Sequence, residues 1–262
     1  MERIARRDLL DVPIALTTYA EAMDVMDGMI ARDERGYVCA VPVHGVMVAQ
    51  HDPELLGALR GANALNVPDG RPLVWALNLL GEELPDRVYG PELTDRYCAR
   101  AAQRGHRVWL YGGHTPAALD QLASALEGRH PGIEIVGRWS PPHRPLTQAE
   151  DQEIANRINA DRPDIVWVGI GVPKQEKWMA RMRPLLEAPV LVGVGAAFDF
   201  LAGRKRQAPP WMQRRGLEWL FRLSQEPRRL LVRYLRYNPA FMVAFARQYL
   251  RERRRGGQRD LL

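Results

Sequence analysis

The chain has 262 residues, of which 46% are hydrophobic and 26% are charged, as in an ordinary globular protein with one sizeable core or two small lobes. It contains no run of about 18 apolar residues, which argues against a membrane-spanning helix, and residues 1–8 lack the apolar core of a signal peptide. Cys39 and Cys98 form neither a disulfide framework nor a CxxC metal motif, so we expect a protein of the reducing cytoplasm.

The predicted core consists of short apolar runs that alternate with helical patterns. We predict strands at 37–43, 64–67, 108–111, 133–136, 165–170 and 190–194, helices at 53–60, 72–80, 91–104, 116–128, 147–160 and after Pro173, and a proline-rich loop at 138–146. Strands separated by helices indicate an α/β fold: a mostly parallel, Rossmann-like sheet flanked by helices on both faces.

The remainder of the chain differs in charge and in pattern. Residues 204–262 contain sixteen Lys and Arg and four Asp and Glu, a balance of +12; because the whole chain carries +6, residues 1–203 carry −6. Apolar residues recur at helical spacing among these arginines, which predicts two or three basic amphipathic helices interrupted by Pro227 and Pro239. We therefore predict an α/β core at 1–203 and a basic helical appendage at 204–262, which would bind a polyanion.

The loop after the strand at 165–170 is the strongest candidate for a ligand site. Gly171 permits close approach of backbone amides, and Pro173 suits the first turn of a helix, whose free N–H groups attract phosphate. Lys174 and Gln175 follow where their side chains reach the same anion. The pattern is typical of a nucleotide-phosphate or sugar site, and also of an ordinary strand-to-helix turn.

Other strand ends carry polar groups. Asp69 follows a short strand and precedes a helix, so it is either a general base in the cleft at the sheet edge or a cap for that helix. Arg87 is either a phosphate ligand or a surface residue. Gly112 and Gly113 end a strand before a helix and form a second phosphate-compatible loop.

Near the end of the core, Asp199 is a polar residue among aromatic ones, and it either hydrogen-bonds a ligand or satisfies backbone amides. The chain has no GxGxxG, no GxxxxGK[ST] and no Asp-x-Asp, and its six histidines are scattered. We therefore expect no metal or other cofactor, and any departing diphosphate must be stabilised by arginines and helix dipoles.

Several of these segments, in this order, resemble the WecG/TagA/CpsF family of bacterial glycosyltransferases. The resemblance covers roughly residues 10–240 and rests on Pro68-Asp69-Gly70, Arg87-Val88-x-Gly90, Gly112-Gly113, Gly169-x-Gly171-x-Pro173-Lys174-Gln175-Glu176, Phe198-Asp199-Phe200-x-x-Gly203, Ala208-Pro209-x-Trp211 and Gly216-Leu217-Glu218-Trp219-x-x-Arg222-Leu223-x-x-Glu226-Pro227-x-Arg229.

The resemblance implies an inverting, metal-independent transferase of cell-surface polysaccharide synthesis. It would move a sugar from a UDP-sugar to a polyprenyl-diphosphate-linked acceptor at the inner face of the plasma membrane, bound peripherally to the anionic membrane surface. Asp69 matches the proposed base of the family, and Arg87 and Gln175 match residues of the same pocket. The predicted substrate-binding residues are His44, Gly112, Gly113, Gly171, Lys174, Gly195, Asp199, Arg222, Arg229 and Arg233. The arginines among them would close over the site and contact the diphosphate.

One segment departs from the family pattern. Where the family has Thr-x-Asn at the end of its early strand, residues 40–44 read Ala-Val-Pro-Val-His, so His44 substitutes for that pair, or the donor differs. The donor sugar is N-acetylmannosamine, its uronic acid or glucose.

Two other functions fit parts of the sequence. One is a nucleic-acid-binding protein with an arginine-rich arm, which the acidic core and the interruptions by Glu218 and Glu226 disfavour. The other is a non-catalytic protein that binds nucleotide-sugars. Exposed apolar helices would also favour a homo-oligomer.

Overall fold

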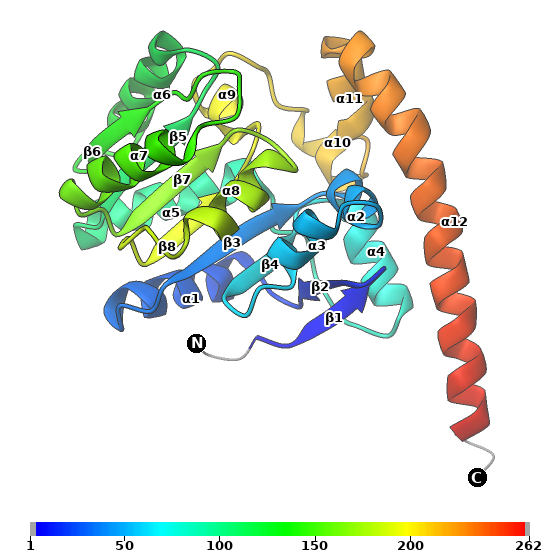
Figure 1. Ribbon diagram of the computed structural model, residues 1–262. Coiled ribbons are helices and arrows are strands. Elements are labelled where there is room, and N and C mark those ends of the chain that lie inside the picture. The colour runs from blue at the N-terminus through cyan, green and yellow to red at the C-terminus, as the bar shows by residue number, and fades with distance from the viewer. Residues whose placement is uncertain (1–3, 260–262) are drawn as a thin grey trace.

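The structure, a computed structural model, describes the backbone of residues 4–259, with side chains except at 210, 229 and 255–259. Within this range the strands are β1 (Arg6–Leu9), β2 (Val12–Ala15), β3 (Gly36–Val41), β4 (Ala64–Pro68), β5 (Arg107–Gly112), β6 (Glu134–Trp139), β7 (Ile165–Gly169) and β8 (Val190–Gly193). The last six form one parallel sheet in the order β4-β3-β8-β7-β5-β6, and β1 and β2 form an antiparallel hairpin (Figure 1).

The helices start where the sequence provides caps. Thr147 forms a capping box with Glu150, and Thr115 caps a helix that begins with Pro116. The helices of the core are α1 (Tyr19–Ala31), α2 (Val43–Ala49), α3 (Pro53–Leu59), α4 (Arg71–Leu79), α5 (Gly90–Arg104), α6 (Pro116–Arg129), α7 (Gln148–Ala160), α8 (Lys174–Met182) and α9 (Ala197–Leu201). They are followed by α10 (Pro210–Arg214), α11 (Glu218–Gln225) and α12 (Pro227–Arg259), which we call the appendage helices.

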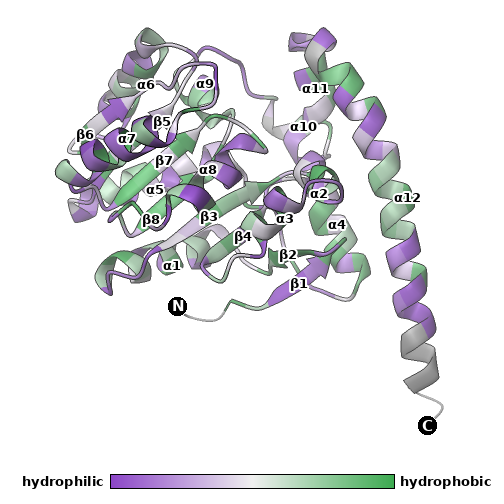
Figure 2. Cartoon of the chain, in the orientation of Figure 1, coloured by the Kyte–Doolittle hydropathy of each residue, from purple (hydrophilic) through white to green (hydrophobic). Residues whose placement is uncertain are grey.

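Alternate residues of each strand contribute to hydrophobic cores on opposite faces of the sheet, as the pleat requires. In β3, Tyr37, Cys39 and Val41 pack with α2, α3, α4, α7 and α8, whereas Val38 and Ala40 pack with α1, α5, α6 and α9. Figure 2 shows hydrophobic residues along the strands between these two layers of helices. The predicted α/β fold, with a parallel sheet covered on both faces, is confirmed.

The order of the strands brings distant parts of the sequence to one edge. The chain completes β3 and β4 at one side of the sheet, crosses to β5 and β6 at the other, and then returns to the centre with β7 and β8. In such sheets, ligands bind outside the carboxyl ends of the strands, near the point where the direction of strand order changes. The loops after β3, β4, β5, β7 and β8 all lie at this edge.

The appendage helices lie along one side of the core (Figure 1). Phe241 and Phe245 of α12 are buried, and this part of α12 packs on α2. Gln248 ties the helix to the hairpin: its Oε1 accepts from Leu10 N (2.8 Å) and its Nε2 donates to Asp8 O (2.9 Å). The apolar faces of the basic helices are therefore partly used for packing on the core.

The structure differs from the sequence predictions in several places. Helix α12 continues through Pro239, where we predicted a break; the packing of Phe241 and Phe245 on the core supports the helix beyond the lost backbone hydrogen bond. Strand β6 extends to Trp139, into the predicted loop. The predicted strand at 37–43 ends at Val41, and Val43 begins α2. The hairpin, α1, α2 and α9 were not predicted.

Candidate active site

Asp69 lies at the carboxyl edge, directly after β4. Its Oδ1 accepts a 2.7 Å hydrogen bond from the backbone N–H of Gly90, the first residue of α5. The following helix, α4, has Gly70 at its N-cap and no side-chain cap, so Asp69 does not cap it. Burial raises the pKa of Asp69 to about 6, against the lowering effects of the Gly90 N–H, Arg87 and Arg222; Glu218 also raises it. A carboxyl group of this pKa suits a general base near neutral pH.

Arg87 lies beside Asp69 and is held on three sides. Its Nη2 lies 2.5 Å from Oε2 of Glu218, the first residue of α11, and 3.3 Å from Oε1 of Gln213 in α10. Its guanidinium lies 4.1 Å from the ring centroid of Tyr89. The side chains of Arg87 and Glu218 are only 11% and 10% exposed, so Arg87 is not a surface residue but part of a buried ion pair.

Arg222, one turn after Glu218 on α11, completes this group. Its guanidinium lies 5.6 Å from the ring centroid of Phe200. Burial lowers the pKa of Arg222, but the neighbouring Tyr234, Tyr89, Glu218 and Asp69 raise it above the usual value. Asp69, Arg87, Tyr89, Glu218 and Arg222 form what we call the acid–arginine cluster.

Gln175 connects two loops at the same edge. Its Oε1 accepts from Gly171 N (3.1 Å), after β7, and from Gly195 N (2.9 Å), after β8. Its Nε2 donates to Glu176 Oε1 (2.9 Å), and both side chains are fully buried. Gln175 therefore fixes the positions of the two loops rather than pointing into open space.

No role is predicted from the sequence for Glu176, yet its environment is unusual. Burial raises its pKa to about 7, and Oε2 has no hydrogen-bond partner within the described residues. Its Oε1 holds the Gln175 amide in the orientation that presents Oε1 to both loops.

The acid–arginine cluster and Gln175 are on the same side of the molecule. Gly90 donates its N–H to Asp69. If a Cβ atom were added to Gly90, it would lie 3.6 Å from Asp69 Oδ1 and 3.3 Å from the carbonyl oxygen of Val194. Val194 precedes Gly195, the residue that Gln175 binds. One short path of contacts therefore joins Asp69 to Gln175.

A cavity of about 560 Å³ lies over the ends of β5, β7 and β8. Five predicted substrate-binding residues line it: Gly113, Gly171, Lys174, Gly195 and Asp199. Its other lining residues include the cations Lys177, Arg181 and Lys205 and the imidazole rings of His114 and His143. This composition favours an anionic ligand such as a nucleoside diphosphate.

Most cations of this cavity already have partners. Lys205 Nζ lies 2.7 Å from Asp199 Oδ2, and Lys177 Nζ lies 2.7 Å from Asp52. Burial raises the pKa of Asp199, but the hydrogen bond and charge of Lys205, with His114 and Arg204, lower it below the usual value. Lys174 is exposed and, within the described residues, has no hydrogen bond or ion pair, so its ammonium group is available to an anion.

The remaining predicted residues lie around these two parts. Gly112 does not line the cavity; at φ 141° its Cα lies so close to β7 that a Cβ would be 2.6 Å from Gly169 O. His44, at the start of α2, faces the appendage, with its ring centroid 5.3 Å from that of Tyr237. Burial and, secondarily, Arg233 lower the pKa of His44 to about 4, so it is neutral near pH 7. The side chain of Arg229 lies outside the described residues.

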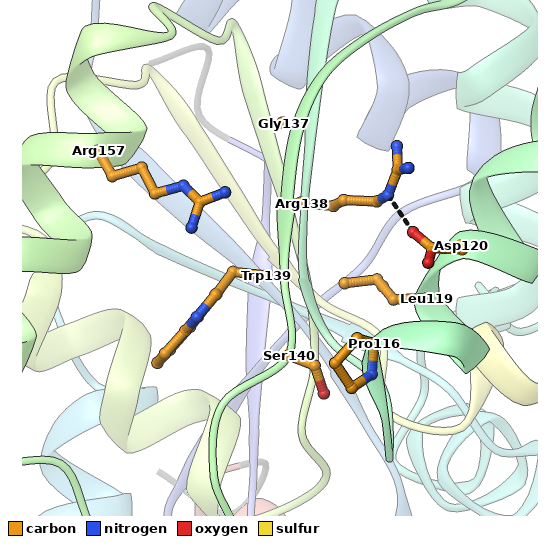
Figure 3. A pocket seen from close by; sticks show the side chains of 8 residues that line it. All are labelled: Pro116, Leu119, Asp120, Gly137, Arg138, Trp139, Ser140 and Arg157. Carbon is orange, nitrogen blue, oxygen red and sulfur yellow. Dashed lines mark hydrogen bonds and ion pairs between the residues drawn. The ribbon is translucent and has the colours of Figure 1, made fainter.

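A separate pocket of about 410 Å³ lies at the outer strand β6, between α6 and α7. Figure 3 shows its lining, in which Arg138 Nε pairs with Asp120 Oδ1 (2.6 Å). None of the predicted site residues lines it, so we do not assign the chemistry to this pocket.

The fold and this edge define a class: a parallel α/β protein with a cation-lined ligand cavity beside an aspartate of raised pKa. The chain belongs to the glycosyl transferase WecG/TagA/CpsF family, whose model matches residues 7–255. The resemblance predicted from the sequence and the assignment as a glycosyltransferase are confirmed.

Curated relatives of this chain are also named as glycosyltransferases. A protein of Bacillus spizizenii, named N-acetylglucosaminyldiphosphoundecaprenol N-acetyl-beta-D-mannosaminyltransferase, is 34% identical over 184 residues, which cover 69% of this chain and 68% of the relative. A protein of the same name from Staphylococcus aureus strain MW2 is 28% identical over 245 residues, 93% of each chain. These comparisons support a transferase and give no support to a nucleic-acid-binding protein.

Proposed function

We propose that this enzyme transfers N-acetylmannosamine from UDP-N-acetylmannosamine to a sugar on a polyprenyl diphosphate, with inversion, in the synthesis of a cell-surface polysaccharide. The names of both relatives describe transfer of this sugar to a diphosphoundecaprenol-linked acceptor. They give no support to glucose or a uronic acid as donor. The observation that carries the proposal is Asp69, with a pKa of about 6 and under the charge of two arginines, at the same sheet edge as the cation-lined cavity.

In this proposal the cavity over β5, β7 and β8 holds the UDP part of the donor, and Lys174 and the N-terminus of α8 contact its diphosphate. The acceptor hydroxyl lies at Asp69, whose carboxylate removes the proton as the oxygen attacks the anomeric carbon. The bond from that carbon to UDP breaks on the opposite face, and UDP leaves with the electron pair. A single displacement of this kind inverts the anomeric configuration.

We also propose that the reaction needs no metal ion. Within residues 4–259 no group of three or more His, Cys, Asp and Glu side chains is arranged to hold one. The charges of Arg87 and Arg222 act on Asp69, and Lys and Arg line the cavity, so cationic side chains would stabilise the diphosphates of donor and acceptor. Arg233 and Arg229, further along the appendage, would contribute to the same task.

Peripheral binding to the inner face of the plasma membrane is the second part of the proposal. In the part of the chain that the structure describes, no helix is both long and apolar enough to cross a bilayer. The appendage exposes large apolar side chains between its arginines, among them Trp211, Trp219, Leu220, Val232 and Leu235. Each basic residue near an anionic leaflet contributes about 1 kcal/mol. The same apolar side chains would allow pairing of two copies.

The test is an assay of UDP release from UDP-N-acetylmannosamine with a short-chain N-acetylglucosaminyl diphosphate lipid as acceptor, with and without a chelator. We expect turnover that requires both substrates and survives chelation. Loss of turnover with the chelator would contradict metal independence. Salt-sensitive RNA binding without turnover would contradict the proposal that the enzyme uses UDP-N-acetylmannosamine. Flotation with anionic and neutral vesicles tests membrane binding: we expect binding to the anionic vesicles that weakens in high salt.

A further inference from the structure

Glu218 occupies a position that the reaction proposed above does not use. It is the first residue of α11, yet its carboxylate points away from solvent and lies 2.5 Å from Arg87 Nη2. The two residues are 131 positions apart in the sequence. This ion pair therefore joins the appendage to the loop that contains Arg87.

The pair is surrounded by charged and hydrogen-bonding groups from several neighbouring elements. Asp69 comes from the end of β4, Tyr89 from the loop before α5, Gln213 from α10 and Arg222 from α11. Two carboxylates and two guanidinium groups thus act on one another in this cluster. Burial and, secondarily, the charge of Glu218 raise the pKa of the Tyr89 phenol, and the Arg87 guanidinium packs over the ring of Tyr89.

Stability alone is a weak explanation for such an arrangement. A buried ion pair loses about as much free energy by desolvation as it gains by attraction, and apolar residues of similar volume often replace it without loss. What the pair does provide is geometry. Glu218, Gln213 and Tyr89 together hold the Arg87 guanidinium, whose charge acts on the carboxylate of Asp69.

We infer that Glu218 is a positioning residue for the transfer reaction: it fixes Arg87 beside Asp69 and anchors α11, with Arg222, over the reacting groups. This inference rests on the proposed function, because it assigns a role next to the proposed base. Glu218 does not itself contact the substrate in this role. It acts through Arg87 and through its charge on Asp69.

The charge of Glu218 gives the inference a signature that a purely structural role lacks. Burial is the main cause of the raised pKa of Asp69, and Glu218 adds to it. Glu218→Gln keeps an oxygen that accepts from Arg87 but removes the negative charge. The pKa of Asp69 then falls, and the acidic limb of the pH profile of kcat/KM moves to lower pH.

The experiment compares Glu218→Gln, Glu218→Ala and a matched control, Glu252→Gln. Glu252 also pairs with an arginine, Arg7, but at the far part of α12, away from Asp69. We expect Glu218→Gln to retain most of the activity above pH 7 with its acidic limb moved down, and Glu218→Ala to lose about ten- to a hundredfold in kcat/KM, the range for a charged hydrogen bond. The control should match the wild type in both respects.

An unmoved acidic limb in folded Glu218→Gln would overturn the inference, as would wild-type kcat/KM in folded Glu218→Ala. Circular dichroism and thermal unfolding establish whether each variant is folded. If Glu218→Ala does not fold, the pH profile of Glu218→Gln alone tests the inference. Failure of the proposed function looks different: the wild type then shows no turnover with the donor, or its acidic limb persists unchanged when Asp69 is replaced.

Discussion

The carboxylate of Asp69 accepts a 2.7 Å hydrogen bond from the backbone N–H of Gly90, at the N-terminus of α5. This bond and the helix dipole stabilise the ionised form, whereas burial and Glu218 favour the neutral one. The result is a carboxyl group with one oxygen fixed and a pKa near 6. Such a group is ionised at pH 7 and still basic enough to take a proton.

The rate of sugar transfer should therefore depend on pH in a defined direction. Since Asp69 acts only when ionised, kcat/KM should fall about tenfold per pH unit below a pH of about 6 and be level above it. The measurement is a pH profile with UDP release as the readout. A profile that stays level down to about pH 4 would contradict this assignment.

The same pKa predicts an effect on stability. The pKa of Asp69 in the folded protein, about 6, exceeds its ordinary value of 3.8, so the folded state binds more protons between these values. The free energy of unfolding therefore falls as pH rises from about 4 to about 6, and this deficit remains at higher pH. Asp69→Asn, which cannot ionise, should be more stable than the wild type at pH 7 by about 1–3 kcal/mol.

Urea unfolding of both proteins at pH 7 and near pH 4 tests this prediction. The gain should vanish at the lower pH, where wild-type Asp69 is neutral. An Asp69→Asn variant that is less stable than the wild type at pH 7 would contradict this prediction. It would show that the ionised Asp69 carboxylate raises the free energy of unfolding, although it is buried.

Gln175 should matter for the shape of the donor cavity. In Gln175→Leu the N–H groups of Gly171 and Gly195 lose their common acceptor, which costs about 1–3 kcal/mol for each group left unpaired. Both glycines line the cavity, so we expect the dissociation constant of UDP to rise by about tenfold or more. Calorimetry measures it.

The control is Gln152→Leu, in which an exposed amide on α7 loses a hydrogen bond to Asn156 (2.9 Å). This change should leave UDP binding as in the wild type. Unchanged UDP affinity in folded Gln175→Leu would show that the two loops hold their positions without Gln175.

Two glycine substitutions should have opposite effects on stability. Gly112→Ala places a Cβ 2.6 Å from Gly169 O at a φ of 141°, which costs about 1–3 kcal/mol or more. Gly128→Ala, in α6 with no atom within 4 Å of the new Cβ, should gain about 0.5–1 kcal/mol in helix propensity. Thermal unfolding separates the two; equal midpoints would contradict the tight approach of β5 to β7.

The sequence predicted the parts of the fold and site that depend on local pattern. Apolar runs located all strands of the parallel sheet, and the residues after them, Asp69 and the glycine loops, lie at its carboxyl edge. What it did not predict depends on contacts between distant segments. Glu218 pairs with Arg87 across 131 positions, and its carboxylate was interpreted only as a break in the basic face.

The same reason accounts for the appendage and for Gln175. Pro239 usually ends a helix, and only the packing of Phe241 and Phe245 on the core shows why α12 continues. The position of Gln175 after Pro173 predicted that it lies near a bound anion. The sequence did not predict that Gln175 binds the loops after both β7 and β8, because this depends on the pairing of these two strands.

The central claim is tested most directly by the anomeric configuration of the product, determined by NMR with UDP-N-acetylmannosamine and the short-chain lipid acceptor, for the wild type and for Asp69→Asn. We predict a product of configuration opposite to that of the donor, formed by the wild type, and a loss of about 10²–10⁴-fold in rate for the folded variant. A product that retains the donor configuration, or near-normal turnover in Asp69→Asn, would contradict Asp69 as the base of a single displacement.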